Sequence, residues 1–156
     1  MTQRRSPPAA IPGRGRWARL GTGGLIALLL AIQLVPYGHQ HTNPPVGTEP
    51  AWPSAQTRQL AVRACYDCHS NQTVWPWYSN IAPMSWLVQR DVIEGRAALN
   101  FSQWNRSRTD SLAEPVQKGS MPPWYYVLLH PQAQLSPSER QTLVQGLTAI
   151  GGQGGH

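Results

Sequence analysis

The residues best suited to chemistry form one run, Cys65-Tyr66-Asp67-Cys68-His69, which contains both cysteines of the 156-residue chain. On a helix, positions i, i+3 and i+4 lie on one face. Two thiols at this spacing meet the edge of one flat molecule, and the adjacent imidazole points toward its centre. C-x-x-C-H is the attachment signature of c-type haem. The run therefore predicts one covalent haem c. Cys65 and Cys68 would form thioether bonds with its vinyl groups, and His69 would be the proximal iron ligand.

Three other uses of the cysteines remain open alternatives. A thioredoxin-like redox pair also has the C-x-x-C spacing, but it requires a βαβ setting that this sequence lacks. A structural zinc site normally has four Cys or His ligands, and no second pair of such residues is present. A plain disulfide between Cys65 and Cys68 is the third alternative, since exported proteins form disulfides.

A sixth iron ligand is expected from a methionine, whose thioether raises the reduction potential of a haem. Met121 lies between Gly119 and the prolines 122 and 123, in a loop stiff enough to hold a sulfur atom in place. We therefore expect Met121 to be the distal ligand. Met84, His130 and an open sixth position are the alternatives.

Nine of the thirteen aromatic residues lie between positions 75 and 126, and a haem is a large apolar surface against which such rings pack. Arginine side chains in the same region, at positions 90 and 96, are suited to binding haem propionates. An ordinary small core or solvated charges would explain the same residues. The predicted haem contacts are Trp75, Trp77, Trp86, Arg96 and Trp124.

The net charge of +6 is confined to the N-terminus, where five arginines precede residue 20. The rest of the chain has eight basic and seven acidic residues, so we expect no nucleic-acid partner. Residues 20–35 contain no charge, which predicts a transmembrane anchor, with a cleaved signal peptide as the alternative. By the positive-inside rule, residues 1–19 are cytoplasmic and the rest is periplasmic, behind a single pass through a bacterial inner membrane.

The remaining sequence divides into a Pro-rich linker at 36–53, a domain at 54–150 and a Gly-rich tail at 151–156. The linker is expected to be a semi-rigid spacer with solvated histidines at positions 39 and 41. No alternating strand pattern is visible, which predicts an all-α, cytochrome c-like domain with long loops. The expected helices run from Ser54 into the cysteine motif, from Pro83 to Leu99, over 111–118 if Pro115 lies in the first turn, and from Pro137 to Ile150 behind a Ser136/Glu139 capping box.

The pattern Cys-x-x-Cys-His-Ser-Asn-x-Thr-x-Trp-Pro-Trp-Tyr-Ser, over residues 65–79, resembles that of the bacterial haem-binding domain family. Further similarities are Gly95-Arg96, Leu99-Asn100-Phe101-Ser102 and Gly119-x-Met121-Pro122-Pro123-Trp124-Tyr125, and the resemblance covers about residues 55–150. It implies a c-type cytochrome-like domain behind one N-terminal membrane segment. It also implies haem attachment at Cys65, Cys68 and His69, with Met121 as the axial sulfur ligand. Pro115 departs from the helix expected before Gly119.

These expectations favour a membrane-anchored monohaem electron carrier, rather than an enzyme, that exchanges electrons with an unidentified redox partner. The first alternative is a small-ligand sensor or peroxidase-like enzyme with an open sixth iron position. Peroxide chemistry normally requires a distal acid or base, and His130 is the one such histidine in the domain besides His69 and the terminal His156. The second alternative is a haem-free thiol or zinc module.

Overall fold

The computed structural model describes residues 14–104 and 112–151. Within these ranges the chain forms α-helices and short 3-10 helices and no strand, which confirms the all-α prediction. The predicted basic N-terminus at 1–19, the start of the predicted helix at 111–118 and the predicted Gly-rich tail at 151–156 lie wholly or partly outside the described residues. The elements are α1 (Arg14–Ile32), α2 (Ala55–Ala64), α3 (Tyr66–His69), η1 (Trp77–Asn80), α4 (Met84–Ala98), α5 (Glu114–Gln117), α6 (Trp124–Leu129), η3 (Pro131–Ala133) and α7 (Pro137–Gly151).

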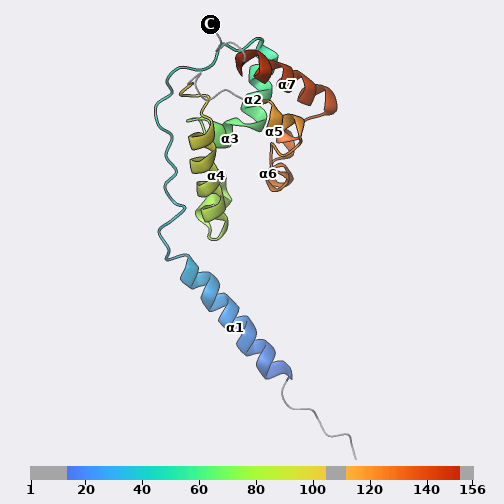
Figure 1. The fold of residues 1–156 in the computed structure, drawn as a ribbon. Coiled ribbons are helices and arrows are strands. Elements are labelled where there is room, and N and C mark those ends of the chain that lie inside the picture. Colours follow the sequence, from blue (N-terminus) through green and yellow to red (C-terminus); the bar gives the residue numbers. More distant parts are fainter. Residues whose placement is uncertain (1–13, 105–111, 152–156) are drawn as a thin grey trace, which may run out of the picture.

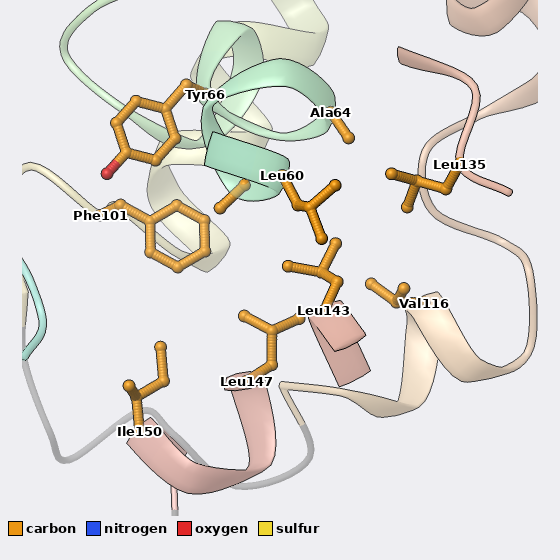
Figure 2. Packing of buried hydrophobic residues seen from close by; sticks show 10 residues of the cluster. Leu60, Ala64, Tyr66, Phe101, Val116, Leu135, Leu143, Leu147 and Ile150 are labelled. Atoms are coloured by element: carbon orange, nitrogen blue, oxygen red, sulfur yellow. The ribbon is translucent and has the colours of Figure 1, made fainter. Parts of the chain in front are cut away.

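The hydrophobic core lies where α2 and α7 pack together at one end of the domain (Figure 1). Leu60 from α2 and Leu143 from α7 point toward each other, and Phe101 and Tyr66 stack at the edge of the same cluster with ring centroids 5.5 Å apart (Figure 2). Leu143 and Phe101 are almost fully buried. The core therefore fixes α2, and through it the cysteine motif that follows.

Local sequence signals account for the helix starts. The hydroxyl of Ser54 accepts a hydrogen bond from the Thr57 backbone N–H at 3.0 Å, as an N-cap residue does. At α7, the Ser136 N–H donates to Glu139 Oε2 at 2.8 Å and the Glu139 N–H donates to Ser136 Oγ at 3.3 Å, so the predicted capping box is confirmed. Pro115 lies in the first turn of α5, where a missing N–H costs nothing.

The sequence did not predict η1 or α6, and it extended one helix through the cysteine motif. In the structure Cys65 ends α2 and begins the separate turn α3, with φ −130° and ψ −33°. Short helices of four to six residues lack the repeated apolar period on which a sequence-based prediction depends.

Residues 36–53 are packed along the domain instead of forming an independent spacer, contrary to the prediction. This segment runs beside α4 (Figure 1). The Gly47 N–H donates to the Ser102 carbonyl at 2.8 Å, and the Trp104 N–H donates to the Thr48 carbonyl at 2.9 Å. We call residues 36–53 the strap. Its residue His41, predicted to be solvated, stacks on Trp75 with ring centroids 4.5 Å apart.

Helix α1 projects away from the rest of the described chain (Figure 1), and its apolar side chains, such as Leu28 and Leu30, are exposed. None of the helices in the described ranges is long and apolar enough to cross a membrane, so the predicted span at residues 20–35 finds no support. The helix begins at Arg14 and ends at Ile32. Its uncharged part, residues 20–32, is therefore about 20 Å long, against roughly 30 Å of hydrocarbon in a bilayer.

Candidate haem site

The cysteine motif is held as a single helical turn at the end of α2. The Cys65 N–H donates to the Ala61 carbonyl at 2.8 Å, so the chain enters the motif directly from a buried helix. The Cys68 and His69 N–H groups both donate to the Cys65 carbonyl, at 3.2 and 2.8 Å. This turn brings both thiols and the imidazole to one cavity, as the spacing predicted.

The cavity has a volume of about 640 Å³, within the range of small-molecule and cofactor sites. It lies between α3 and α4 on one side and the segment from α5 to α6 on the other (Figure 1). Most of its wall is apolar, and Arg90, Asp91 and Glu94 of α4 supply charges. Residues from both parts of the chain line it, including Cys65, Cys68, His69, Leu99, Phe101, Val116, Met121, Tyr125, Tyr126 and Leu147.

The two sulfur atoms form no disulfide in the structure. Burial raises the pKa of the Cys65 thiol to about 12, and it also raises the pKa of the Cys68 thiol to about 12, with a smaller effect from Asp91. Both thiols are therefore protonated at neutral pH. A redox-active C-x-x-C pair instead needs a thiol pKa below the ordinary value, so these pKa values disfavour a thioredoxin-like use.

The His69 ring is fixed in the orientation that a metal ligand needs. Its Nδ1–H donates to the Leu99 carbonyl at 3.2 Å, because a carbonyl oxygen only accepts. Burial lowers the pKa of His69, which favours the neutral imidazole. The lone pair of Nε2 is then free to bind a metal, and the backbone acceptor supplies the outer-shell contact that orients metal-bound histidines.

Helix α4 packs against the motif at a position that only glycine allows. A Cβ atom added to Gly95 would lie 2.4 Å from the carbonyl oxygen of Cys68. Leu99, whose carbonyl accepts the hydrogen bond from His69, is the C-cap residue of the same helix. The Phe101 N–H then donates to the His69 carbonyl at 2.8 Å, which ties the segment after α4 to the motif.

Arg96, predicted to contact haem propionates, lies outside the cavity wall among the described residues and binds protein groups instead. Its guanidinium donates to the carbonyls of Ser70 at 2.7 Å and Thr42 at 2.9 Å. It also donates to Asn43 Oδ1 at 2.9 Å and Thr73 Oγ1 at 2.8 Å. Arg96 therefore joins α4, the strap and the loop that follows His69.

The polar residues after the motif build that loop. Ser70 Oγ donates to the Tyr66 carbonyl at 2.8 Å and accepts from the Gln72 N–H at 2.9 Å. Thr73 Oγ1 donates to the Asp67 carbonyl at 2.7 Å. Asn71 is buried, donates to the Pro45 carbonyl and accepts from Asn100 Nδ2, both at 2.8 Å. The side chains of the Ser-Asn-x-Thr pattern therefore stabilise the loop after His69. The pattern was recognised in the sequence as a motif, but its structural role was not predicted.

Met121 lines the same cavity as His69, as the sequence predicted. Its backbone N–H and that of Ser120 both donate to the Pro115 carbonyl, at 3.1 and 3.0 Å. Gly119 before it has a φ of +74°, a backbone conformation that favours glycine. Met121 is 36 % exposed where it lines the cavity. Neither Met84 nor His130 lines the cavity wall in the described part of the chain.

The four predicted tryptophans do not line the cavity wall in the described residues. Trp75 donates from Nε1 to Asn43 Oδ1 of the strap at 3.3 Å, and Trp86 lies half-buried on α4. Trp77 and Trp124 are each 77 % exposed. The aromatic residues that do line the wall are Phe101, Tyr125 and Tyr126.

Sequence reasoning missed two carboxylate–phenol pairs at the cavity. The Tyr126 hydroxyl donates to Asp67 Oδ2 at 2.6 Å, and the Tyr125 hydroxyl donates to Asp91 Oδ2 at 3.1 Å. Asp67 lies between the two cysteines and also accepts from the Val74 N–H at 3.0 Å. The one signal in the sequence was the position of Asp67 between the two cysteines. Nothing in the sequence pairs Asp67 with Tyr126, which lies 59 positions away.

The donor set fits a haem better than a bare metal ion. Two protonated thiols, one neutral imidazole and one thioether line one apolar cavity. Thioether and imidazole are established axial ligands of haem iron. Within the described ranges, no group of three or more His, Cys, Asp or Glu side chains could hold a metal ion, so the zinc alternative has no support there.

Comparison with known proteins agrees with this geometry. The family model described as a haem-binding domain matches residues 27–149, a span that includes the strap and every element from α2 to α6. No curated protein and no solved structure matches the chain significantly. Because the family match covers well over half of the sequence, this protein belongs to the haem-binding domain family.

Proposed function

We propose that this protein is a monohaem, c-type cytochrome-like electron carrier. The observation that supports the proposal most is that Cys65, Cys68, His69 and Met121 line one largely apolar cavity. A bound haem supplies one-electron chemistry, because its iron cycles between the ferric and ferrous states. Cys65 and Cys68 would hold it by thioether bonds, and His69 and Met121 would bind its iron.

The protein's own part in electron transfer is to orient His69, to position Met121 and to exclude water. The Leu99 carbonyl orients His69, and the loop at 70–73 fixes the backbone behind it. The apolar wall lowers the local polarity, and burial is one of the factors that set a haem potential. Because the proposed sixth position is filled by Met121, turnover of a substrate at the iron is not part of this function.

Covalent attachment is tested by expressing the full chain together with the cytochrome c maturation machinery and staining a denaturing gel for haem. We expect a haem-positive band for the wild type and none for the Cys65→Ser/Cys68→Ser double variant. A well-exported wild-type protein that loses its haem under denaturation contradicts covalent attachment. The haem to protein ratio of the purified protein tests the single haem.

Sulfur ligation is tested by Met121→Ala, with Met84→Ala as the matched control. We expect Met121→Ala to lose the ferric charge-transfer band of a methionine-bound haem and to bind exogenous ligands, because a small side chain leaves the sixth position free. Met84→Ala should retain the wild-type spectrum, since Met84 does not line the cavity in the described chain. An unchanged spectrum in Met121→Ala rules out this ligand.

The second candidate function is small-ligand binding, because α6, the helix next to Met121, is tied to α3 and α4 through two side-chain hydroxyls. A sulfur that leaves the iron readily would give carbon monoxide, nitric oxide or peroxide access to it. The distinguishing measurement is carbon monoxide binding to the reduced wild-type protein. Binding comparable to that of Met121→Ala favours a sensor or peroxidase, whereas much weaker binding favours the electron carrier.

The proposal also includes attachment of the chain to a bacterial inner membrane through its N-terminal segment, with the haem domain in the periplasm. Five arginines precede residue 20, and the apolar side chains of residues 20–30 are exposed on α1. Extraction of bacterial membranes with alkaline carbonate tests attachment, and an alkaline phosphatase fusion after residue 53 tests the side. Release of the protein into the soluble fraction, or an inactive fusion, contradicts this part.

A further inference from the structure

Helix α6, which follows directly after Met121 and two prolines, is held to the domain in an unusual way. None of its residues, Trp124–Leu129, is buried. Trp124 is 77 % exposed and Leu128 is 70 % exposed. A surface helix of a globular protein normally stays in place by burying an apolar stripe. Tyr125 and Tyr126 of α6 face the cavity instead, and their hydroxyls make polar contacts to other parts of the described chain.

Two consecutive tyrosines of α6 supply such contacts. The Tyr126 hydroxyl donates to Asp67 Oδ2 at 2.6 Å, and the Tyr125 hydroxyl donates to Asp91 Oδ2 at 3.1 Å. Asp67 belongs to the cysteine motif on α3, whereas Asp91 belongs to α4. The two hydroxyls therefore reach across the cavity to both elements that hold the proximal side, and both tyrosines line the cavity wall.

The acceptors suit this role. A hydrogen bond to a carboxylate is shorter and stronger than one between neutral groups. Burial raises the pKa of both phenols, so both hydroxyls keep the protons that they donate. Asp67 is in turn fixed by the Val74 N–H at 3.0 Å.

The position of α6 is transmitted to Met121 through two prolines. Proline locks φ, so residues 122 and 123 form a stiff connection between Met121 and the first turn of α6. The other end of the loop is held independently, because the Met121 N–H donates to the Pro115 carbonyl at 3.1 Å. The position of the backbone between Met121 and α6 therefore depends on where the two tyrosines hold the helix.

We propose that Tyr125 and Tyr126 are positioning residues for the sixth iron ligand, which hold α6 and with it Met121 against the cavity. We call the two hydroxyl–carboxylate pairs the tyrosine clamp. The inference rests on the proposed function, in which the Met121 sulfur binds the iron. Release of the clamp would let α6 move outward and would raise the fraction of molecules in which Met121 does not hold the iron. An exogenous ligand binds in proportion to that fraction.

The experiment compares four variants of the full-length, haem-loaded protein with the wild type: Tyr126→Phe, Tyr125→Phe, the double variant and Tyr37→Phe. Each substitution removes one hydroxyl and keeps the ring. Tyr37 is the matched control because it lies on the strap, 46 % exposed, and does not line the cavity. The readouts are the ferric sulfur-to-iron band, the affinity for cyanide, and hydrogen exchange of the amides of α6.

We expect the double variant to bind cyanide about tenfold more tightly or better, each single clamp variant severalfold more tightly, and Tyr37→Phe like the wild type. Hydrogen exchange in α6 should accelerate in the same order. Met121→Ala sets the upper limit of cyanide affinity. If Met121→Ala binds more tightly but the double tyrosine variant matches the wild type, the clamp is refuted while sulfur ligation stands. If Met121→Ala itself matches the wild type, sulfur ligation fails and the clamp inference fails with it.

Discussion

The two sides of the cavity are built by different means. On the His69 side, buried helices and a polar network hold the ligand, and Arg96 alone donates to four acceptors. On the Met121 side, the helix next to the ligand buries no residue, and two tyrosine hydroxyls span the cavity. One side is therefore locked by packing, while the other is held by a few contacts that can open. Under the proposed function, His69 is the firmly held ligand and Met121 is the adjustable one.

The largest test of this comparison removes the centre of the polar network with Arg96→Met. The apolar part of the side chain is kept, but the Ser70 and Thr42 carbonyls and two side-chain acceptors lose their donor. We expect unfolding free energy to fall by about 2–4 kcal/mol, because hydrogen bonds from a charged donor are strong and their loss leaves acceptors unpaired. Urea unfolding of the haem-loaded protein measures the change.

Arg140→Met is the matched control from the opposite side. Within the described ranges Arg140 donates one side-chain hydrogen bond, from Nη1 to the Val116 carbonyl at 3.0 Å, on the chain segment that leads to Met121. Its replacement should cost only about 1 kcal/mol. Equal losses of unfolding free energy in the two variants would show that the two sides of the cavity depend equally on their arginines. That result would contradict the difference between the two sides.

The next effect concerns the contact between α4 and the motif. In Gly95→Ala, the new Cβ would lie 2.4 Å from the Cys68 carbonyl oxygen, so α4 must move away from the motif. We expect a loss of about 1–3 kcal/mol, the usual cost of overpacking, and less haem attached per protein. Calorimetry and the haem to protein ratio report the two changes.

Gly23→Ala serves as the control, because an added Cβ at Gly23 meets nothing within 4 Å. This variant should match the wild type or be slightly more stable, since alanine favours a helix more than glycine does. If Gly95→Ala is as stable as Gly23→Ala and holds as much haem, the close approach of α4 to Cys68 is not a constraint on the site.

The smallest expected effect is a pH dependence at the end of the strap. Arg58 donates to both oxygens of Glu49, at 2.8 Å each, and this pairing lowers the pKa of Glu49 to about 2. A carboxylate with a lowered pKa stabilises the fold above its ordinary pKa of 4.5, and the stabilisation disappears as the pH falls from there toward 2. Because Arg58 is partly exposed, we expect about 1 kcal/mol at neutral pH.

Thermal unfolding of the wild type and Glu49→Gln between pH 7 and 2.5 measures this contribution. The difference in melting temperature should be constant above about pH 5 and shrink toward zero below it. A difference that stays constant down to pH 2.5 would show that the Glu49 carboxylate does not stabilise the strap through its charge. Titration of haem ligands affects both proteins equally and cancels in the comparison.

Much of the site could be predicted from the sequence, because it depends on residues that are only a few positions apart. Cys65, Cys68 and His69 lie within one helical turn, and Met121 has a loop of glycine and prolines around it. Helix caps at Ser54 and Ser136 also act within three residues. Local geometry of this kind is dictated by nearby backbone groups, so the turn of the cysteine motif and both helix caps appear in the structure. Haem attachment and iron ligation by these residues stay predictions.

The sequence was less informative where distant segments meet. It assigned Arg96 and four tryptophans to haem contacts from their type alone, whereas the cavity wall in the described residues uses Phe101, Tyr125 and Tyr126. It predicted that residues 36–53 form a semi-rigid spacer, because prolines and polar residues indicate extended chain but do not indicate which part of the protein that chain packs against. No periodicity pairs Asp67 with Tyr126 or Arg96 with Thr42, since such contacts join residues 59 and 54 positions apart.

The sequence by itself therefore determined the helical class and the local turn of the cysteine motif, because each depends on residues a few positions apart. It also supplied the prediction that His69 and Met121 bind the iron. Only the tertiary structure decided which side chains enclose the cofactor cavity, that the strap is part of the domain, and that α6 is tied to the motif through tyrosine hydroxyls. The physical reason is that these features arise from packing between segments brought together by the core of α2 and α7. The pattern of apolar residues along one segment predicts which face is buried, but it does not predict which other segment packs against that face.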